Sequence, residues 1–423
     1  MKKKKEIFSI LIGTAIDYYD NMLFMHFLFL LTPLFFPTNN PIMAGTLALG
    51  SFAACYIIRP IGGIVFGHFG DRLGRKKSLY FSILLMSFPT LIIGLLPTYE
   101  QIGIAAPVIL ISCRLAQNFF VGGEAAGGFV SLIEFSNPKH KGLVASILNV
   151  GAMLGGLLGT TLGYLFTQPF MPEWGWRIPF LMGAIVGWLG LRMRLKFSET
   201  PAFKKAKQDN NLFKIPLVNL LMYQRLDLLR TMIMPAGFVA PYFMVFVYVS
   251  NIFKNDFHLQ SFEVMKINSL IMLIWLLLFP MMGYLSDIVD RRKMIQMAAL
   301  SIFIISYPLF VLVTENPTLL NYIFLQIVLS VAGTAIVGAS APLIASFYST
   351  SLRYTGIAFG WSIGVAIFGA SAPLISNQLV IWTGNKSAPS LFLMLCGLIS
   401  ALSTLSLRSR INTDIPQLSE TST

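Results

Sequence analysis

Hydrophobic residues recur in long runs along the whole chain, and short clusters of charged and turn-forming residues separate these runs. A helix rises 1.5 Å per residue, so a run of ~20 apolar residues crosses the ~30 Å hydrocarbon core of a bilayer. Because lipid offers no partner for open backbone polar groups, each run is predicted to be helical. The pattern predicts spans at roughly 7–35, 42–68, 78–97, 102–133, 142–168, 177–195, 231–253, 266–286, 294–313, 319–349, 355–382 and 389–407.

Composition supports this interpretation. Hydrophobic residues make up 55% of the 423 positions and charged residues only 12%, whereas soluble domains carry about 25% charged residues. The sequence therefore predicts an all-α membrane protein of twelve transmembrane helices.

Catalytic chemistry is not indicated. The four histidines and the three cysteines show no metal, disulfide or triad spacing, and no phosphate-binding glycine loop is followed by Lys-Ser/Thr. We therefore expect no enzyme activity, no metal and no bound cofactor.

A charged hairpin occurs twice. Gly67-His-Phe-Gly-Asp71-Arg72-Leu-Gly74-Arg75-Lys76-Lys77 returns without gaps as Gly283-Tyr-Leu-Ser-Asp287-Ile-Val-Asp290-Arg291-Arg292-Lys293, about half the chain length further on. A repeat of this length indicates a duplicated bundle rather than a solenoid, whose period is about 20 to 50 residues. We predict a six-helix bundle over 1–195, a cytoplasmic linker over 196–230, a second six-helix bundle over 231–408 and a cytoplasmic tail over 409–423.

The placement of positive charge predicts the topology. With the N-terminus in the cytoplasm, 25 of the 31 Lys and Arg residues fall on the cytoplasmic side. The opposite side holds Arg177, Lys254, Lys266 and Lys386. This bias places both termini in the cytoplasm. It also explains the net charge of +13 without a nucleic-acid partner, so the expected environment is the lipid bilayer.

Charged residues inside the spans are the strongest indication of function, because each costs several kcal/mol (~3) unless it is paired or hydrated. They gather in the first half: Asp17, Asp20, Arg59, Arg114 and Glu124. The second half has almost none. We expect the polar machinery to lie in the first half.

Asp17 and Asp20 share one face of a helix, because they are three residues apart. The rise per residue places Asp17 about 15 Å and Arg59 about 12 Å from the cytoplasmic side, so we expect one aspartate to pair with Arg59. The other carboxylate would then be able to load and unload a proton. The alternative is a plain ion pair that locks two helices.

Arg114, Gln117 and Glu124 lie in the fourth span, near mid-membrane. Arg114 is able to hold a substrate carboxylate through two hydrogen bonds, or to pair with an acid of the first span. Arg59, Arg114 and Gln117 are our charged and polar candidates for substrate contact, with Arg59 and Arg114 for the carboxylate. Asp17, Asp20 and Glu124 are the candidates for proton coupling.

The second half offers uncharged groups, among them Tyr242, Trp275 and Trp361. Aromatic residues in spans are mostly packing or interface residues, but some could line a cavity opposite the charged half. Tyr242 and Trp361, with Tyr18 of the first span, are our aromatic candidates for substrate contact.

The hairpin suggests a gate. Asp71 follows the second span and is able to cap the positive N-terminus of a helix of the other half, and Arg75 is able to reach Glu134. Such contacts would hold the inside face closed in one state and break in the other. We include Gly67, Arg72, Gly74, Asp287 and Arg291 in this predicted gate.

Gly67-x-x-x-Asp71-Arg72-x-Gly74-Arg75-Lys76 resembles the signature loop of the major facilitator superfamily. Arg59-Pro60-x-Gly62, Arg114-x-x-Gln117 with Gly122-Gly123-Glu124, Trp174-Gly-Trp-Arg177-Ile-Pro and Glu199-Thr200-Pro201-Ala-Phe203 resemble its metabolite:proton symporter family. The resemblance implies two pseudo-symmetric bundles, a central cavity, alternating access driven by protons and a bacterial inner membrane. Asp17-Tyr18-Tyr19-Asp20-Asn21 departs from the family pattern near the expected cavity, so no one member's substrate is transferred.

The expected function is proton-coupled import of a small polar metabolite: an organic acid, an amino acid or a betaine-like zwitterion. The proton would be the coupling ion, and we expect a monomer. The alternatives are an exporter or exchanger of the same fold, or a membrane sensor that does not transport.

Overall fold

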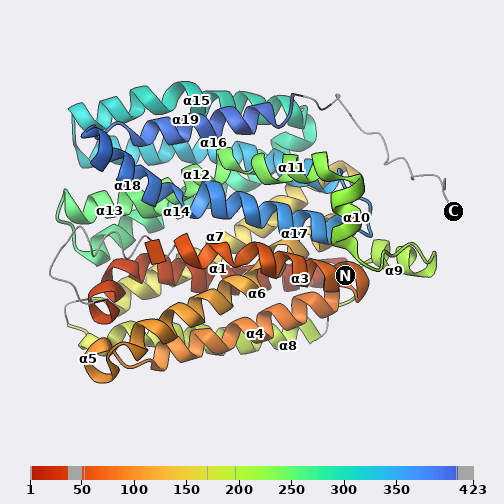
Figure 1. The fold of residues 1–423 in the computed structure, drawn as a ribbon, viewed down its shortest axis with the longest axis horizontal. Coiled ribbons are helices and arrows are strands. Elements are labelled where there is room, and N and C mark those ends of the chain that lie inside the picture. Colours follow the sequence, from red (N-terminus) through yellow and green to blue (C-terminus); the bar gives the residue numbers. More distant parts are fainter. Residues whose placement is uncertain are drawn as a thin grey trace.

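Long helices run between the two ends of the molecule in the computed structural model (Figure 1), which describes residues 2–36, 50–51, 53–168, 170–195, 197–405 and 407. Among these residues, ten helical segments are long and apolar enough to cross a membrane, and α1 and the shorter α19 complete the twelve predicted segments. The predicted tail over 409–423 and residues 42–49 of the predicted second span lie outside the described part of the chain.

The first half contains six membrane helices: α1 (Lys2–Phe35), α3 (Arg59–Arg72), α4 (Arg75–Leu95), α6 (Ala105–Phe135), α7 (Lys141–Phe166) and α8 (Arg177–Leu195). The short elements in and after it are α5 (Tyr99–Ile102), η1 (Pro138–His140), η2 (Glu173–Trp176), α9 (Pro201–Gln208) and α10 (Pro216–Tyr223). Residues 53–57, which precede α3, are also helical.

The second half begins with a segmented helix made of α11 (Arg225–Ile233), α12 (Ala236–Phe243), η3 (Met244–Tyr248) and α13 (Val249–Asn255). It continues with α14 (Ser261–Ile288), α15 (Arg291–Glu315), α16 (Leu319–Ala345), α17 (Arg353–Gly364), η4 (Val365–Ala370), α18 (Ala372–Thr383) and α19 (Pro389–Leu402). The seventh segment starts at Arg225, ahead of the span predicted from 231, so the last part of the predicted linker is helical.

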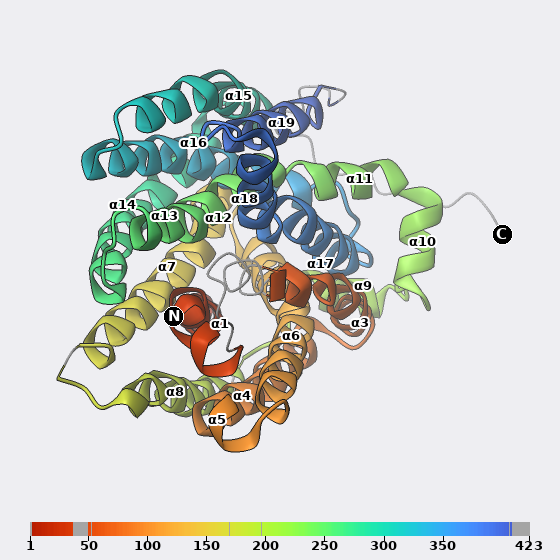
Figure 2. The same cartoon turned by 60° about the vertical axis from the view of Figure 1, so that its left-hand side comes forward.

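The halves pack through two helix pairs. α7 runs along α14, and α3 runs along α17. Figure 2 shows these four helices between α4, α5 and α8 of the first half, on one side, and α15, α16 and α19 of the second half on the other. The interface between the halves is therefore built from corresponding helices of the two repeats.

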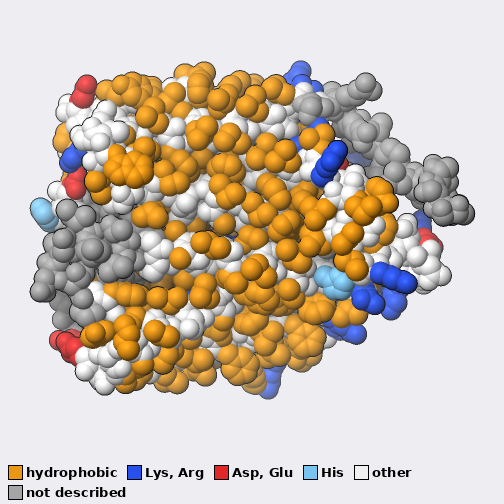
Figure 3. Space-filling model, viewed as in Figure 1, with side chains coloured by type: hydrophobic (Ala, Val, Ile, Leu, Met, Phe, Trp, Pro, Cys, Tyr) orange, Lys and Arg blue, Asp and Glu red, His pale blue; other side chains and the backbone are white. Residues whose placement is uncertain are grey.

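The flank of the bundle is apolar, as lipid contact requires. In Figure 3 hydrophobic side chains cover the face between the two ends, while most visible Lys and Arg side chains gather at the end where α9 and α10 lie. We call this end, which includes the hairpins between α3 and α4 and between α14 and α15, the basic end. The charge asymmetry of the sequence is thus an asymmetry of the folded molecule.

Two of the second-half spans contain wide helical turns. η3 and η4 are π-helical, and they lie next to Pro241 in α12 and Pro373 in α18. Proline lacks the N–H that an α-helical turn needs, and π-turns often occur at functional positions of helices. Each of these two spans therefore has an irregular turn close to a proline.

Glycines recur every four residues along α7, at Gly151, Gly155 and Gly159, and these three pack against the backbone of α1. Small residues at this spacing allow two helices to approach closely. A Cβ built on Gly155 would lie 1.8 Å from the backbone oxygen of Ala15, so no side chain fits there.

Gly155→Ala is expected to destabilise the protein by about 1–3 kcal/mol, because α1 and α7 must move apart to admit the methyl group. Thermal unfolding in detergent measures the effect. Gly333→Ala in α16 is the matched control, since its added Cβ would meet nothing closer than 3.7 Å. Equal melting temperatures for the two variants would contradict the packing argument.

Candidate functional site

Asp20 is the centre of a buried polar cluster in the first half. Its carboxylate accepts hydrogen bonds from Thr90 of α4 at 2.9 Å, from the Gln117 amide at 2.7 Å and from the Arg114 guanidinium at 3.3 Å. Arg114 also donates to the Gln117 side-chain oxygen at 2.7 Å and lies over the Phe24 ring. One carboxylate thus joins α1, α4 and α6 in the interior of the bundle.

The predicted ion pair between Arg59 and an aspartate of the first span is wrong. Within the described residues, Arg59 forms no ion pair, and Asp20 pairs with Arg114 instead. The rise per residue gives the depth of a side chain in the membrane, but it does not tell which neighbouring helix the side chain faces. Asp20 faces α4 and α6, which leaves Asp17 with both carboxylate oxygens buried and without a hydrogen-bond partner. Of the two alternatives for Arg114, the structure shows the internal pair.

Glu124 lies in a second buried cluster. It pairs with Arg194 of α8 at 2.5 Å and accepts a hydrogen bond from Ser82 of α4. The sequence analysis did not select Arg194 as a site residue. Arg194 lies at the cytoplasmic end of the sixth span, where the positive-inside rule already explains a positive charge. Its long side chain reaches back into the bundle and lies beside Gly13 of α1, where an added Cβ would lie 2.2 Å from the guanidinium.

Arg194→Gln is expected to destabilise the folded protein by about 3–5 kcal/mol, because it leaves Glu124 as a buried, unpaired charge. The double variant Glu124→Gln/Arg194→Gln removes both charges and should recover a large part of that loss. Thermal unfolding of the two single variants and the double variant completes the cycle. If the stability loss of the double variant equals the sum of the two single losses, the two side chains are not energetically coupled, which would contradict the pairing argument.

The aromatic candidates lie where the halves meet. Tyr242 of α12 directs its hydroxyl at the Met22 sulfur of α1, at 3.6 Å. Tyr56 donates to the Asn21 side chain and packs edge-on against Phe243 of the second half. Tyr18 is half-buried on α1. The described positions of Tyr18 and Tyr242 are therefore compatible with contact to a substrate between the halves.

Trp361 belongs to an aromatic cluster of the second half. It is half-buried and packs on Phe238, which also contacts Tyr242 and the fully buried Trp275. The Trp275 indole donates to Ser330. Packing therefore accounts for Trp275, whereas Trp361 keeps an accessible face.

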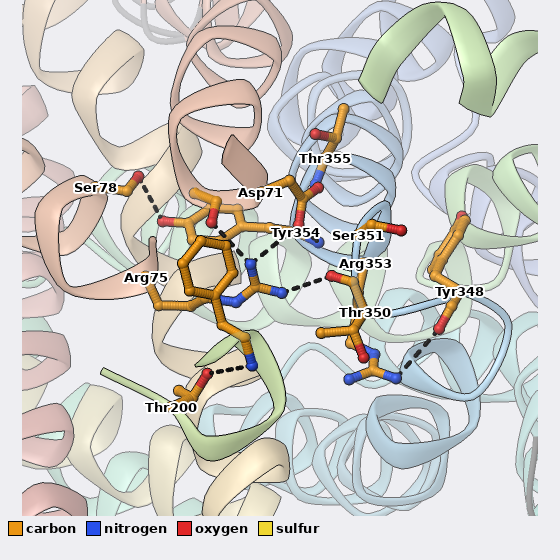
Figure 4. A network of polar contacts seen from close by, with 12 residues as sticks. Asp71, Arg75, Ser78, Thr200, Tyr348, Thr350, Ser351, Arg353, Tyr354 and Thr355 are labelled. Carbon is orange, nitrogen blue, oxygen red and sulfur yellow. Dashed lines mark hydrogen bonds and ion pairs between the residues drawn. The ribbon is translucent and has the colours of Figure 1, made fainter. Parts of the chain in front are cut away.

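The hairpin at the basic end contacts the second half as predicted. The Asp71 carboxylate accepts from the backbone N–H groups of Tyr354 at 3.2 Å and Thr355 at 2.8 Å, in the first turn of α17 (Figure 4). Unpaired N–H groups and the helix dipole make this position favourable for a negative charge. The prediction that Asp71 caps a helix of the other half is confirmed.

Arg75 and Glu134 also meet as predicted, at 3.1 Å. Arg75 donates in addition to the Thr350 backbone oxygen of the second half, and Glu134 pairs with Arg353 at 3.0 Å. Arg353 was not among the predicted gate residues, since its sequence position suggested only cytoplasmic charge. Figure 4 shows it in the same network as Asp71 and Arg75.

Tyr348 supports the second-half side of this network. Its hydroxyl contacts Thr231 and donates to the Asp227 backbone oxygen, while its own carbonyl accepts from Arg353. Burial raises the pKa of the Tyr348 hydroxyl, so the group is neutral at physiological pH.

The second copy of the hairpin makes the reciprocal contact. Asp287 accepts from the backbone N–H groups of Gly142 at 2.7 Å and Leu143 at 2.9 Å, in the first turn of α7, and pairs with Arg291. Each half therefore uses one aspartate to hold the start of a helix in the other half.

The remaining gate residues differ in their contacts. Gly67 lies against α17, where an added Cβ would be 2.7 Å from the Thr355 Cα. Gly74 has φ +111°, which favours glycine, and the Glu199 carboxylate that accepts from the Arg75 N–H lies beside it. Arg72 is exposed and, within the described residues, forms no ion pair with the second half. Its predicted part in the gate thus has no support from the geometry.

Comparison with known proteins identifies the fold family. The model of the Major Facilitator Superfamily matches residues 10–374. The chain belongs to the major facilitator superfamily. Its solved neighbours include the proton:xylose symporter XylE bound to 6-bromo-6-deoxy-D-glucose, with a TM-score of 0.76 and 16% identity, covering 96% of this chain and 94% of that one. That likeness shows the twelve-helix fold alone.

Curated relatives narrow the family. The proline/betaine transporter of Escherichia coli (strain K12) is 29% identical over 97% of this chain and 84% of its own length. The glycine betaine/proline/ectoine/pipecolic acid transporter OusA of Dickeya dadantii (strain 3937) is 30% identical over the same shares. The inner membrane metabolite transport protein YhjE of Escherichia coli (strain K12) is 35% identical over 85% of this chain and 84% of its own length.

These relatives confirm the resemblance to the metabolite:proton symporter family. The major facilitator protein described here is a multi-pass membrane transporter of a small molecule, and not an enzyme.

Proposed function

We propose that this transporter imports a small polar metabolite, either a zwitterion or an organic acid, together with protons. The observation that carries the proposal is the buried Asp20–Arg114–Gln117 cluster inside a transporter fold. A carboxylate held by a guanidinium in a low-dielectric interior is able to gain and lose a proton as its partners move. Two curated relatives are named as transporters of proline and betaine. These names support a small polar metabolite as the substrate.

Asp20 is proposed to couple the proton to conformational change. Its carboxylate binds α1 to α4 and α6 through three donors. Protonation turns one acceptor oxygen into a donor and removes the charge that attracts Arg114, so the three helices are held less firmly. Because α1 also packs on α7, which contacts the second half, such a change is transmitted toward the interface. Glu124 and Asp17 are the other candidate coupling residues.

The basic end is proposed to face the cytoplasm of a bacterium, with the protein in the inner membrane and both termini inside. The positive-inside bias supports this orientation. In the described conformation, aspartates of both hairpins hold helices of the opposite half at this end. The structure then corresponds to a state closed toward the cytoplasm, and inward opening requires these contacts to break.

Uptake of radiolabelled glycine betaine or L-proline into proteoliposomes tests the coupling. Uptake should accelerate several-fold when an inward proton gradient is imposed and collapse when a protonophore is added. Uptake that ignores the gradient would refute coupling. An exchanger would take up substrate only into vesicles preloaded with substrate, whether or not a gradient is imposed, and substrate efflux driven by an inward proton gradient would indicate an exporter.

A further inference from the structure

The short helix α10 is apolar on every side, although one side of it is exposed. Asn219 is its only residue with a fully polar side chain. On the exposed side, the large side chains are between 47% and 72% exposed, and they are Val218, Leu221, Met222 and Tyr223. A helix that is apolar all round belongs in a protein core or in lipid. The exposed side of α10 therefore needs an apolar environment that the described part of the chain does not supply.

The length and direction of α10 place it at the membrane surface. Its eight residues rise about 12 Å, which is less than half of the ~30 Å hydrocarbon core. In Figure 1 it runs across the direction of the long helices, at the basic end, where the spans finish. It contacts α11, whose Leu226 and Leu229 are 55% and 50% exposed. The bilayer that covers these leucines is therefore able to cover α10 as well.

The opposite side of α10 is packed on the protein. Pro216 and Leu220 are buried, and the helix contacts both α3 of the first half and α17 of the second half. Gln224, which follows the helix, donates to the Phe347 backbone oxygen. Because α10 is held from this side, its exposed side faces away from the bundle.

Positive charges flank this apolar surface. Lys214 precedes α10 and Arg225 follows it; both are exposed, and neither forms an ion pair within the described residues. Three further exposed lysines lie on α9: Lys204, Lys205 and Lys207. The nearby Asp227 carboxylate already pairs with Arg230. In Figure 3 Lys and Arg side chains accordingly lie beside apolar side chains at this end of the molecule.

We propose that α10 and its flanking cations form a docking surface for anionic phospholipids of the leaflet at the basic end. The exposed apolar side of the helix inserts among the upper parts of the acyl chains. Lys214 and Arg225 bind the anionic headgroups, since Lys and Arg near a negatively charged leaflet are attracted to it. Interfacial helices combine these two contributions to binding. Tyr223 ends the helix at headgroup level, where aromatic residues are enriched.

A protein partner, or a second copy of the chain, is the alternative occupant of this surface. Such a partner would compete with lipid, because the surface adjoins the apolar flank that the bilayer covers (Figure 3). The positive charges beside α10 are complementary to an anionic leaflet. Lipid is therefore the occupant that the surface fits, and the inference depends on neither the transported substrate nor the coupling ion.

Spin-labelled lipids test the docking surface. Met222→Cys, in a cysteine-free background, carries a bimane fluorophore, and the full-length protein is assembled into phosphatidylcholine nanodiscs. The nanodiscs contain a small, equal fraction of phosphatidylglycerol or phosphatidylcholine with a nitroxide in the upper acyl chain. Quenching by the phosphatidylglycerol probe should exceed quenching by the phosphatidylcholine probe by at least about threefold. Ile304→Cys, exposed on the apolar flank in α15, is the control and should be quenched equally by both probes.

Two charge variants examine the cations in the labelled protein. Lys214→Gln/Arg225→Gln should lower the ratio of quenching by the two probes at least about twofold. Lys139→Gln/Lys293→Gln removes two exposed charges at the same end but away from α10, and should leave the ratio unchanged. Lys214→Arg/Arg225→Lys keeps the charges and should keep the ratio. Salt at about 1 M, where the Debye length is ~3 Å, should lower the ratio toward one.

The outcomes separate lipid from other occupants. If neither probe quenches the fluorophore at Met222→Cys while both quench it at Ile304→Cys, α10 lies outside the bilayer, and the proposal is overturned in favour of a protein partner. Equal quenching by the two probes at Met222→Cys would overturn the preference for anionic lipid. A ratio that survives in Lys214→Gln/Arg225→Gln, or is lost in Lys214→Arg/Arg225→Lys, would contradict the assigned role of the two cations.

Discussion

Asp71→Asn is expected to lower the rate of transport by about 10- to 100-fold while the protein remains folded. Asp71 holds the first turn of α17 through two backbone N–H groups and lies 3.4 Å from Arg75. Charge-assisted hydrogen bonds of this kind contribute about 1.5–3 kcal/mol. Loss of the negative charge therefore shifts the equilibrium between the closed and open states of the basic end by a factor of about 10 to 150.

Initial rates of uptake in proteoliposomes measure the change in transport rate. The shift between the closed and open states is measured by alkylation of a cysteine introduced at Ser146, which is buried where α7 packs against α14. In a cysteine-free background, alkylation should be faster in Asp71→Asn. Asp209→Asn, exposed at the end of α9, is the control at the same end of the molecule. Normal uptake with unchanged alkylation would show that Asp71 does not act as a gate.

Asp20→Asn is expected to abolish accumulation driven by the proton gradient while exchange of substrate across the membrane continues. Asparagine has almost the same shape, and its single amide oxygen is still able to accept from Gln117 and Arg114, but it cannot carry a proton. For one proton moved with a neutral substrate, a potential of 100 mV is worth about 2.3 kcal/mol, or about 50-fold accumulation. In the variant this ratio should fall to about one.

Accumulation and counterflow are both measured in the same proteoliposomes. Counterflow in Asp20→Asn should stay within about threefold of wild type, because exchange needs the conformational cycle with substrate bound but no net proton movement. Asp256→Asn, whose carboxylate is exposed and pairs with Lys386, is the control for loss of an acidic charge. Gradient-driven accumulation by Asp20→Asn would exclude Asp20 as the coupling residue and leave Asp17 and Glu124.

The two hairpins suggest how the halves move against each other. Asp71 holds α17 and Asp287 holds α7, so each half contributes one acid and one helix start to the same end. The Arg75–Glu134–Arg353 network adds a third connection beside the first. Opening this end requires several charge-assisted contacts to break together, which favours two discrete states over a continuous range.

Much of the architecture could be derived from sequence. Runs of apolar residues are long enough to cross a bilayer, and in lipid they have no alternative to helix. The internal repeat identified the duplicated hairpin, and the types of its residues predicted that Asp71 would cap a helix of the other half. The contact between Arg75 and Glu134 was predictable for the same reason, since both lie at the same end of adjacent spans.

Only the tertiary structure decided which buried charges meet. Rise per residue places Asp17, Asp20 and Arg59 at similar depths, but the rotation of each helix about its axis determines the partner, and that rotation follows from packing such as the close contact of Gly155 with α1. Arg194 and Arg353 show the same limit, because a long side chain at the end of a span is able to point outward as topological charge or inward to an acid. The hydrophobic pattern thus determines that the chain spans the membrane, whereas side-chain packing determines that Asp20 pairs with Arg114 and that Glu124 pairs with Arg194.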